Sequence, residues 1–323
     1  MPPYAIDRKL VVAVSSSALF DLAESDRVFE NDGPRAYESY QLAHLDHPLE
    51  KGVAFPFIRR FLKINERFLS EMPVEVVLLS RNTATTGRRV SRSIAHHGLD
   101  ISRAAFMGGG SPYPYIPAFN ASLFLSADAA DVLGAIDAGY PAGRVLPGPV
   151  LDDAEDDELC VAFDFDGVLA DDEAEAVYRR TGDLNDFHSH ERDKADVPLM
   201  PGPLADLFKK LSRMQKLEDR AAASDRSYRR VLRTAIITAR NAPADERMIT
   251  TLQSWGVSAN ETYFLGGMAK SRVLDVLRPH IFFDDQLSHL EGNECSVPMV
   301  HIPFGIANAK VGPQAESSEG DAQ

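Results

Sequence analysis

Two aspartates, Asp164 and Asp166, follow an apolar run and precede a glycine, an arrangement that presents reactive acids. The run 159–163 is expected to be a buried strand, and Gly167 lets the backbone turn sharply after it. Ligands of doubly wound α/β sheets bind at the carboxyl ends of strands. Carboxylates on alternate residues repel each other unless a cation lies between them, and Mg²⁺ is the simplest such cation. The pair therefore predicts a magnesium site.

Further polar residues follow in the same half of the chain, each at an expected strand end or helix start: Thr238, Lys270, and the pair Asp284 and Asp285. This ordered set is typical of phosphoryl transfer, because a carboxylate can attack phosphorus and leave an acyl phosphate that water cleaves. Asp164 is the predicted nucleophile. Asp166 is predicted to protonate the leaving ester oxygen and then to deprotonate the attacking water.

The other members of the set are assigned to binding and charge neutralisation. Thr238 and Ala239 are predicted to bind phosphoryl oxygens, and Lys270 supplies a fixed positive charge. The expected metal ligands are Asp164, the backbone carbonyl of Asp166, Asp284 and Asp285, and the sequence leaves open which of the last two contacts the ion directly. Enzymes accelerate phosphate-monoester hydrolysis by up to ~10²¹. Neutralisation by metal and lysine must therefore carry much of the catalysis.

A coincidence of ordinary residues and a signalling domain both compete with this assignment. Each residue alone has an ordinary role, since paired aspartates occur in many loops, threonines cap helices and lysines lie on surfaces. Receiver domains of signalling relays also use acids, a threonine and a lysine. In those domains the paired acids precede the phosphorylated aspartate, whereas here the pair Asp164 and Asp166 comes first. The order favours an enzyme.

Composition restricts the class of protein. The length of 323 residues, with 44% hydrophobic and 25% charged residues, is typical of a soluble protein with two domains of ordinary size. A net charge of −14 argues against nucleic acid as the main partner. The N-terminal apolar run is too short for a signal peptide, and no segment reaches membrane-spanning length. Cys160 and Cys295 lack metal-ligand spacing, and Cys160 is expected to be a buried thiol. A cytoplasmic protein is expected.

Strands alternate with helices along the chain, which predicts an α/β fold with a parallel sheet. Strands are expected at 9–14, 74–79, up to 106, 123–125, 159–163, 233–238, 262–265 and 280–283, and helices at 55–69, 85–97, 171–181, 204–214, 244–255 and 271–277, with Asp128 capping another. The acidic run 151–158 is expected to be a solvated linker. It would separate an N-terminal domain (1–150) from a catalytic domain (159–309), and the tail 310–323 is expected to be disordered.

The two halves of the chain resemble each other. AVSSSALFD aligns with AFDFDGVLA, LLSRN with ITARN, AFMGGG with YFLGGM, and LFLSADA with IFFDDQL. This alignment places Ser15, Ser17, Ser126 and Ala127 on Asp164, Asp166, Asp284 and Asp285, respectively. The first half is therefore interpreted as a duplicated copy that has lost its chemistry. The alternative is a chance likeness between two α/β units.

The first half could still carry a second site. Ser80, Arg81 and Asn82 border the expected crevice at its strand ends, and the glycines at 108–110 could bring backbone N–H groups close to an anion. The copy is either a packing platform or a site for a regulatory nucleotide. Packing is favoured, because a fold alone implies no function.

The polar segment 183–203 is expected to form a small cap over the phosphate site. Phe187 could stack on a nucleobase, and His188, His190, Arg192 or Arg240 could bond to base or ribose. The alternative is a surface helix with solvated charges. The histidines do not predict zinc, since no cysteine or third clustered ligand accompanies them.

These motifs resemble the haloacid dehalogenase superfamily, and the chain is similar to the cytosolic 5′-nucleotidase I family. The likeness runs from Leu10 to about Gly305 and includes AVSSSALFD, AFPFIRR, GGGSP, LSADA, AIDAGYPA, PLMPGPL, ITARN, LQSWGV and RPHIFFDDQ. It implies a Rossmannoid sheet with a small cap, preceded by a degenerate repeat of the same kind. One departure is Phe165, where vertebrate members have glycine.

The resemblance also implies Mg²⁺-dependent hydrolysis of a nucleoside 5′-monophosphate such as AMP, IMP or a deoxynucleotide. Under it, Asp164 is the nucleophile, Asp166 the acid and base, Thr238 and Lys270 the phosphate ligands, and Asp284 a metal ligand. A homo-oligomer is expected. The alternatives are a nucleotide-binding regulatory protein without turnover and a related phosphatase for another small phosphomonoester.

Overall fold

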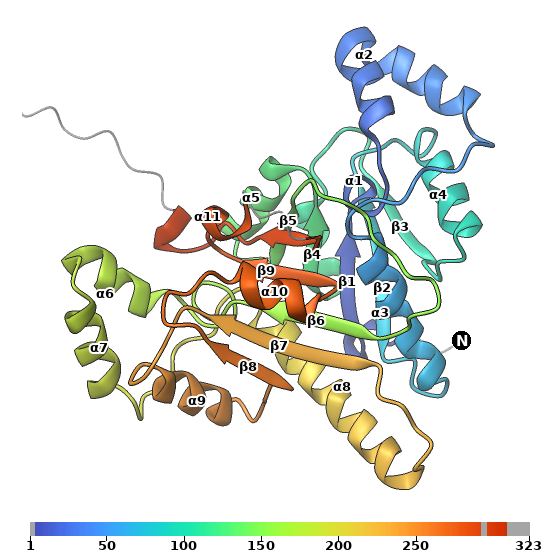
Figure 1. Cartoon of the computed structure of the whole chain (residues 1–323). Helices are drawn as coiled ribbons and strands as arrows, with labels where there is room; N and C mark the ends of the chain where they lie inside the picture. The colour runs from blue at the N-terminus through green and yellow to red at the C-terminus, as the bar shows by residue number, and fades with distance from the viewer. Residues whose placement is uncertain (1–3, 292–295, 309–323) are drawn as a thin grey trace, which may run out of the picture.

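The computed structural model of the chain describes residues 4–291 and 296–308, so Cys295 and the tail 310–323 lie outside the described residues. Its centre is a ten-stranded sheet, counted within those residues, of order β3-β2-β1-β4-β5-β10-β9-β6-β7-β8 (Figure 1). The strands are β1 (Leu10–Val14), β2 (Val74–Ser80), β3 (Arg103–Phe106), β4 (Ala121–Ser126), β5 (Ala142–Val145), β6 (Leu159–Phe163), β7 (Leu232–Thr238), β8 (Glu261–Phe264), β9 (Ile281–Asp284) and β10 (Met299–His301). Every pairing is parallel except that of β5 with β10. The predicted α/β class is confirmed.

The helices follow the strands in the alternation that the sequence predicted. They are α1 (Ser16–Leu19), α2 (Ala23–Ala43), α3 (Phe55–Arg67), α4 (Gly87–His96), α5 (Ala129–Asp137), α6 (Glu173–Thr181), α7 (Leu184–Asp193), α8 (Ala205–Ser224), α9 (Asp245–Ser254), α10 (Ser271–Leu277) and α11 (Leu287–Leu290), with short 3₁₀ turns at Ile6–Arg8, Tyr113–Tyr115, Pro117–Phe119 and Ile306–Asn308. Asp128 caps α5 as expected, accepting a hydrogen bond from the N–H of Asp131 at 2.8 Å. No helix in the described ranges has both the length and the apolar character needed to span a bilayer.

The sheet consists of two units with the same topology. Written from the outer edge inward, the first unit is β3-β2-β1-β4-β5 and the second is β8-β7-β6-β9-β10, so each places its own strands in the order 3-2-1-4-5. Hydrogen bonds repeat as well. Ser15 donates its N–H to Leu125 at 2.8 Å, and Asp164 donates to Phe283 at 2.8 Å. The expected degenerate repeat is therefore present in the fold.

Structural equivalence corrects the sequence alignment at two points. The N–H of Met107 donates to the carbonyl of Ser80, and the N–H of Leu265 donates to that of Thr238, both at 2.9 Å. Ser80 thus occupies the position of Thr238, not that of Ala239 as LLSRN over ITARN implied. Correspondingly, the side chain of Ser16, rather than that of Ser17, contacts Asn82 at 3.3 Å. The turn after β6 is one residue longer than the turn after β1, because the bridge of Phe20 with Lys51 corresponds to that of Ala170 with Pro201.

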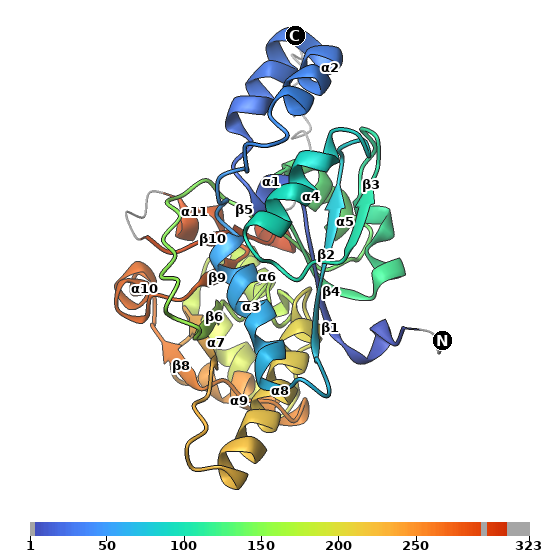
Figure 2. The ribbon, with the colours of Figure 1, turned by 90° about the vertical axis from the view of Figure 1, so that its right-hand side faces the viewer.

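The two units join through strands that the sequence analysis did not predict. The short strands β5 and β10 pair antiparallel, with Val300 opposite Val145 and His301 opposite Arg144. Helix α3 packs against β6, and α8 packs against β1 and β4, so each unit supplies a helix to the strands of the other (Figure 2). One core cluster includes residues of both units. The domain boundaries at 150 and 158 remain a proposal, because sheet and core are continuous.

The acidic segment between the units was expected to be a solvated linker, but part of it is buried. The carboxylate of Asp152 is 3% exposed and receives Lys51 at 2.9 Å, Arg59 at 3.0 Å and Arg60 at 2.7 Å. Burial raises the pKa of Asp152, but the three cations outweigh burial and lower it to about 2. The segment is therefore fastened to the N-terminal unit by a buried ionic cluster.

We predict that Asp152→Asn lowers the free energy of unfolding by about 1 to 2 kcal/mol at pH 7. A carboxylate whose folded pKa lies below its ordinary 3.8 stabilises the protein above that pH, and this contribution disappears as pH falls toward 2. Urea unfolding at pH 7 and pH 3 should show a mutant deficit that shrinks in acid. Asp153→Asn is the control, because the Asp153 carboxylate is exposed and, among the described residues, accepts a hydrogen bond only from the N–H of Glu155. Equal stability of Asp152→Asn and wild type at pH 7 would contradict the account.

Candidate active site

The carboxyl ends of three neighbouring strands bring the predicted residues together. Asp164 follows β6, Thr238 ends β7, and Asp284 ends β9, which lies beside β6. Lys270 precedes α10 and places its Nζ 2.6 Å from Asp164 Oδ2 and 2.7 Å from Asp284 Oδ2. All four side chains are buried. These residues are brought together by the order of the strands in the sheet and not by proximity in the sequence.

Burial governs the electrostatics of the cluster. Burial and the neighbouring Asp284 raise the pKa of Asp164 to about 7, although Lys270 opposes the shift. Burial would also raise the pKa of Asp284, but Lys270 and His289 outweigh burial and lower it. The pKa of Lys270 is raised, since Asp164 and Asp284 outweigh the opposing effect of burial. The ammonium therefore stays charged, and of the two carboxylates that contact it, that of Asp164 is the less stabilised.

Asp285 adds a third buried carboxylate beside this cluster. Burial and repulsion from Asp164 and Asp284 raise its pKa to about 9. Within the described part of the chain, its Oδ1 is a buried oxygen without a hydrogen-bond partner. Gly167 makes room for it: a Cβ there would lie 2.6 Å from the Asp285 carboxyl group, and the φ of +71° favours glycine in any case.

The cluster fits a hard cation. Three buried carboxylates, those of Asp164, Asp284 and Asp285, face one ammonium, and an unsatisfied buried oxygen among them is costly without a further positive charge. Oxygen donors of this kind are the ligands that Mg²⁺ takes.

His289 is a member of the cluster that the sequence analysis missed. It lies on the short helix α11, and its Nδ1 is 3.2 Å from both carboxylate oxygens of Asp284. Asp164, Asp284 and His289 present ligand atoms within 4.8 Å of one another. The sequence places His289 five residues after Asp284, and this spacing alone does not predict the contact.

Asp166 is held by Arg240, a residue that the sequence analysis assigned to the nucleoside. The guanidinium donates from Nε to Oδ2 at 2.8 Å and from Nη2 to Oδ1 at 2.7 Å, a bidentate pair. The amide N–H of Arg240 also donates to the hydroxyl of Thr238 at 3.2 Å. Arg240 is thus engaged with the predicted acid and base.

The segment 183–203, which was expected to form a cap, contains α7, and α7 packs against α6 as a helical hairpin that begins at Glu173 (Figure 1). Its role as a cap stays a prediction. Its residues contact the core loop after β7. The ring of Phe187 lies 5.9 Å from the guanidinium of Arg240, and His188 Nε2 is 3.3 Å from Asn241 Oδ1. His190 instead bonds within the hairpin to Glu173 at 3.1 Å. A nucleoside role for these side chains stays a prediction, as does the phosphate role of Ala239, whose residue is exposed.

The N-terminal unit has neutral side chains at the same strand ends. Ser15 and Ser17 bond to each other at 3.0 Å. Arg81 is engaged by Asp131 at 2.6 Å, and the N–H groups of Gly108 and Gly109 donate to backbone carbonyls. The groups that were expected to attract an anion are therefore satisfied within the protein.

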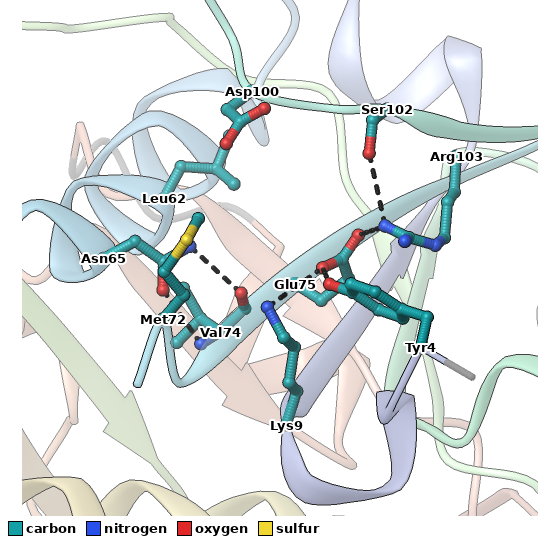
Figure 3. A pocket seen from close by; sticks show the side chains of 10 residues that line it. All are labelled: Tyr4, Lys9, Leu62, Asn65, Met72, Val74, Glu75, Asp100, Ser102 and Arg103. Atoms are coloured by element: carbon teal, nitrogen blue, oxygen red, sulfur yellow. Dashed lines mark hydrogen bonds and ion pairs between the residues drawn. The ribbon is translucent and has the colours of Figure 1, made fainter. Parts of the chain in front are cut away.

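A cavity of about 200 Å³ lies at the opposite end of the sheet, near the starts of β1, β2 and β3 (Figure 3). Its polar side chains pair with one another: Glu75 accepts from Tyr4 and Arg103 and forms an ion pair with Lys9 at 3.5 Å. It is remote from Asp164 and is not part of the site.

Comparison with known proteins agrees with the geometry. A family model described as 5′-nucleotidase matches residues 2–309. The human protein named cytosolic 5′-nucleotidase 1B is 35% identical over 289 residues, which make up 88% of this chain and 47% of that protein. The chain thus spans about half the length of this curated relative. No solved structure matches the chain.

We predict that Gly167→Ala weakens Mg²⁺ binding by at least ~10-fold, because the added Cβ displaces Asp285 and small misplacements cost orders of magnitude in a preorganised site. Gly139→Ala is the matched control: its φ is +78° but its Cβ would meet nothing within 4 Å. Gly139→Ala should lose about 1 kcal/mol of stability from the strained backbone, and Gly167→Ala should lose more, because its Cβ also meets Asp285. Calorimetric titration with Mg²⁺ measures the affinity of each variant. Equal affinities of the two variants would contradict the prediction that Asp285 is a metal ligand.

Proposed function

The chain belongs to the 5′-nucleotidase family, and we propose that it hydrolyses nucleoside 5′-monophosphates to a nucleoside and phosphate through an aspartyl-phosphate. The observation that carries the proposal is the buried contact of Lys270 with both Asp164 and Asp284, next to Thr238 and Asp166. This combination supplies a nucleophile, a proton carrier, a hydroxyl donor and a fixed cation at one strand edge.

Mg²⁺ is the proposed cofactor, held by Asp164, the carbonyl of Asp166, Asp284 and Asp285. When bound, it would supply positive charge to the phosphoryl oxygens during transfer. The fit rests on the surplus of carboxylates and on the unpartnered Oδ1 of Asp285. The metal assignment of Asp285 explains why Gly167 must leave that carboxylate its space.

In the first step, Asp164 attacks phosphorus while the bond from phosphorus to the ester oxygen breaks. Asp166 delivers its proton to that oxygen, and the nucleoside leaves as an alcohol. Thr238 and the backbone at Ala239 bind phosphoryl oxygens. Lys270 keeps Asp164 aimed and balances the added negative charge.

In the second step, water attacks the phosphorus of the acyl phosphate. Asp166, now a carboxylate, accepts the proton of the water, and the bond from phosphorus to the Asp164 oxygen breaks. Phosphate leaves, and both carboxyl groups return to their starting states.

The substrates proposed are AMP, IMP or deoxynucleoside monophosphates, and Phe187 of the cap is proposed to stack on the base. The name of the human relative supports a cytosolic location. The competing candidates are a related phosphatase for another small phosphomonoester and a protein that binds nucleotides without turnover.

We propose that the N-terminal unit is a scaffold rather than a nucleotide sensor. Its Arg81 is bound to Asp131, and its glycine N–H groups are used internally. It contributes α3 to the packing of β6, which carries the nucleophile. A homo-oligomer remains part of the proposal.

We predict that Asp164→Asn abolishes phosphate release from every nucleoside monophosphate, because an amide is no nucleophile toward phosphorus. Wild type should release phosphate only with Mg²⁺ present and should stop in excess chelator. The variant should unfold cooperatively like wild type, which shows that the loss is chemical.

The panel of nucleoside monophosphates also separates the rivals. Binding without phosphate release by wild type would indicate a regulatory protein, and release only from non-nucleotide esters would indicate another phosphatase. Turnover by Asp164→Asn at the wild-type rate would remove the mechanism.

A further inference from the structure

The cap and the predicted acid and base share one arginine. Arg240 donates hydrogen bonds to both carboxylate oxygens of Asp166. Its Nη1 also donates to Glu191 of cap helix α7 and, at 2.9 Å, to the carbonyl of Ala244. The side chains of Arg240 and Glu191 are 2% and 0% exposed. A fully buried carboxylate requires such a partner, since an unpaired buried charge is strongly unfavourable.

The ionic chain extends from Glu191 across both helices of the cap. Arg247 of α9 donates from Nη1 to Glu191 at 2.8 Å and from Nη2 to Glu173 of α6 at 3.0 Å. Glu173 also binds Lys194. The cap thus contributes the acids and the core contributes the arginines. The end of this chain of contacts is Asp166.

The N-terminal unit provides an internal comparison, because α2 with its kink at Gly33 occupies the place of the α6–α7 hairpin. Arg89 donates from Nε to the carbonyl of His47 at 2.9 Å, as Arg247 does to Val197 at 2.9 Å.

In that unit Arg89 meets Gln41 at 3.4 Å, where Arg247 meets Glu191. Asn82 stands where Arg240 is, and contacts Ser16. In the N-terminal unit the hairpin therefore docks with two amides, Gln41 and Asn82, where the C-terminal unit has Glu191 and Arg240. We call these two side chains the amide pair. The charged pair occurs in the unit that contains Asp166.

We propose that Glu191 and Arg240 form a positioning pair that couples docking of the cap to the orientation of Asp166 toward the leaving oxygen. This rests on the proposed hydrolysis. A bidentate arginine fixes the plane of the carboxyl group and uses two of its roughly four lone-pair sites, leaving a free site to carry the proton that passes to the leaving oxygen. Glu191 neutralises the charge of the guanidinium at Nη1, the nitrogen that does not contact Asp166. Arg240 therefore stays buried and oriented toward Asp166 only while α7 is docked.

The proposal predicts a specific pattern of lost activity. Protonation by Asp166 matters for an alcohol leaving group and little for a thiol, whose anion leaves unaided. The test therefore compares the preferred nucleoside monophosphate with its 5′-thio analogue, in which sulfur replaces the bridging oxygen. Recognition of the nucleoside is the same in both, and kcat/KM reports the transfer step for each.

We expect Arg240→Lys, which loses the bidentate fork, to lower kcat/KM for the oxygen ester at least ~30-fold and for the thio ester less than ~3-fold, within the ~10²- to 10⁴-fold range of general acid–base catalysis. The double variant Arg240→Asn with Glu191→Gln reproduces the amide pair of the N-terminal unit and guards against misfolding. It should show the same pattern. Gln41→Ala is the matched control and should leave both esters unaffected.

A double-mutant cycle measured on the oxygen ester tests, independently of the thio ester, whether Arg240 acts through Asp166. If Arg240 acts through Asp166, Arg240→Lys costs nothing further in an Asp166→Asn background. Additive losses in the cycle, or equal losses on both esters, would make the pair merely structural and overturn the proposal. Absence of turnover by wild type would instead refute the proposed hydrolysis.

Discussion

The chemistry of the C-terminal unit depends on a surplus of buried carboxyl groups around one ammonium group. Lys270 lies 2.6 Å from Asp164 and 2.7 Å from Asp284, and Asp285 adds a third buried carboxylate to the same edge. Such a surplus is unfavourable in a protein interior unless a further cation binds among the carboxyl groups. The order of strands β9, β6 and β7 brings these groups together, and Gly167 leaves space for the carboxyl group of Asp285.

The N-terminal unit shows what the same fold looks like without that constraint. Serines stand at the ends of β1 and β4, where the C-terminal unit has Asp164 and Asp284, and the backbone hydrogen bonds between the strands are retained. The fold therefore does not need the charged cluster in order to form. The first unit instead supplies α3 and the partner strand β5 to the second, which links packing of the scaffold to the geometry of the site.

The sequence predicted the strand-end acids, Lys270, Thr238 and the repeat, because each depends on local pattern and order. It did not predict β5 and β10, which are too short to show alternation, or the ionic chain through Arg240, Glu191 and Arg247. Those residues lie far apart in sequence, and charges on an amphipathic helix are ordinarily interpreted as solvated. The prediction of a solvated linker at 151–158 was incomplete for the same reason, since only the fold shows that Asp152 contacts three cations.

The central claim is that phosphate passes through a covalent bond to Asp164. Acid quenching of wild type within the first turnover of a ³²P-labelled nucleoside monophosphate, followed by peptide mapping, tests it directly. The account predicts a hydroxylamine-labile label on the peptide that contains Asp164, and none in Asp164→Asn. Label on another residue, or free phosphate formed in the first turnover with no labelled protein, would contradict it.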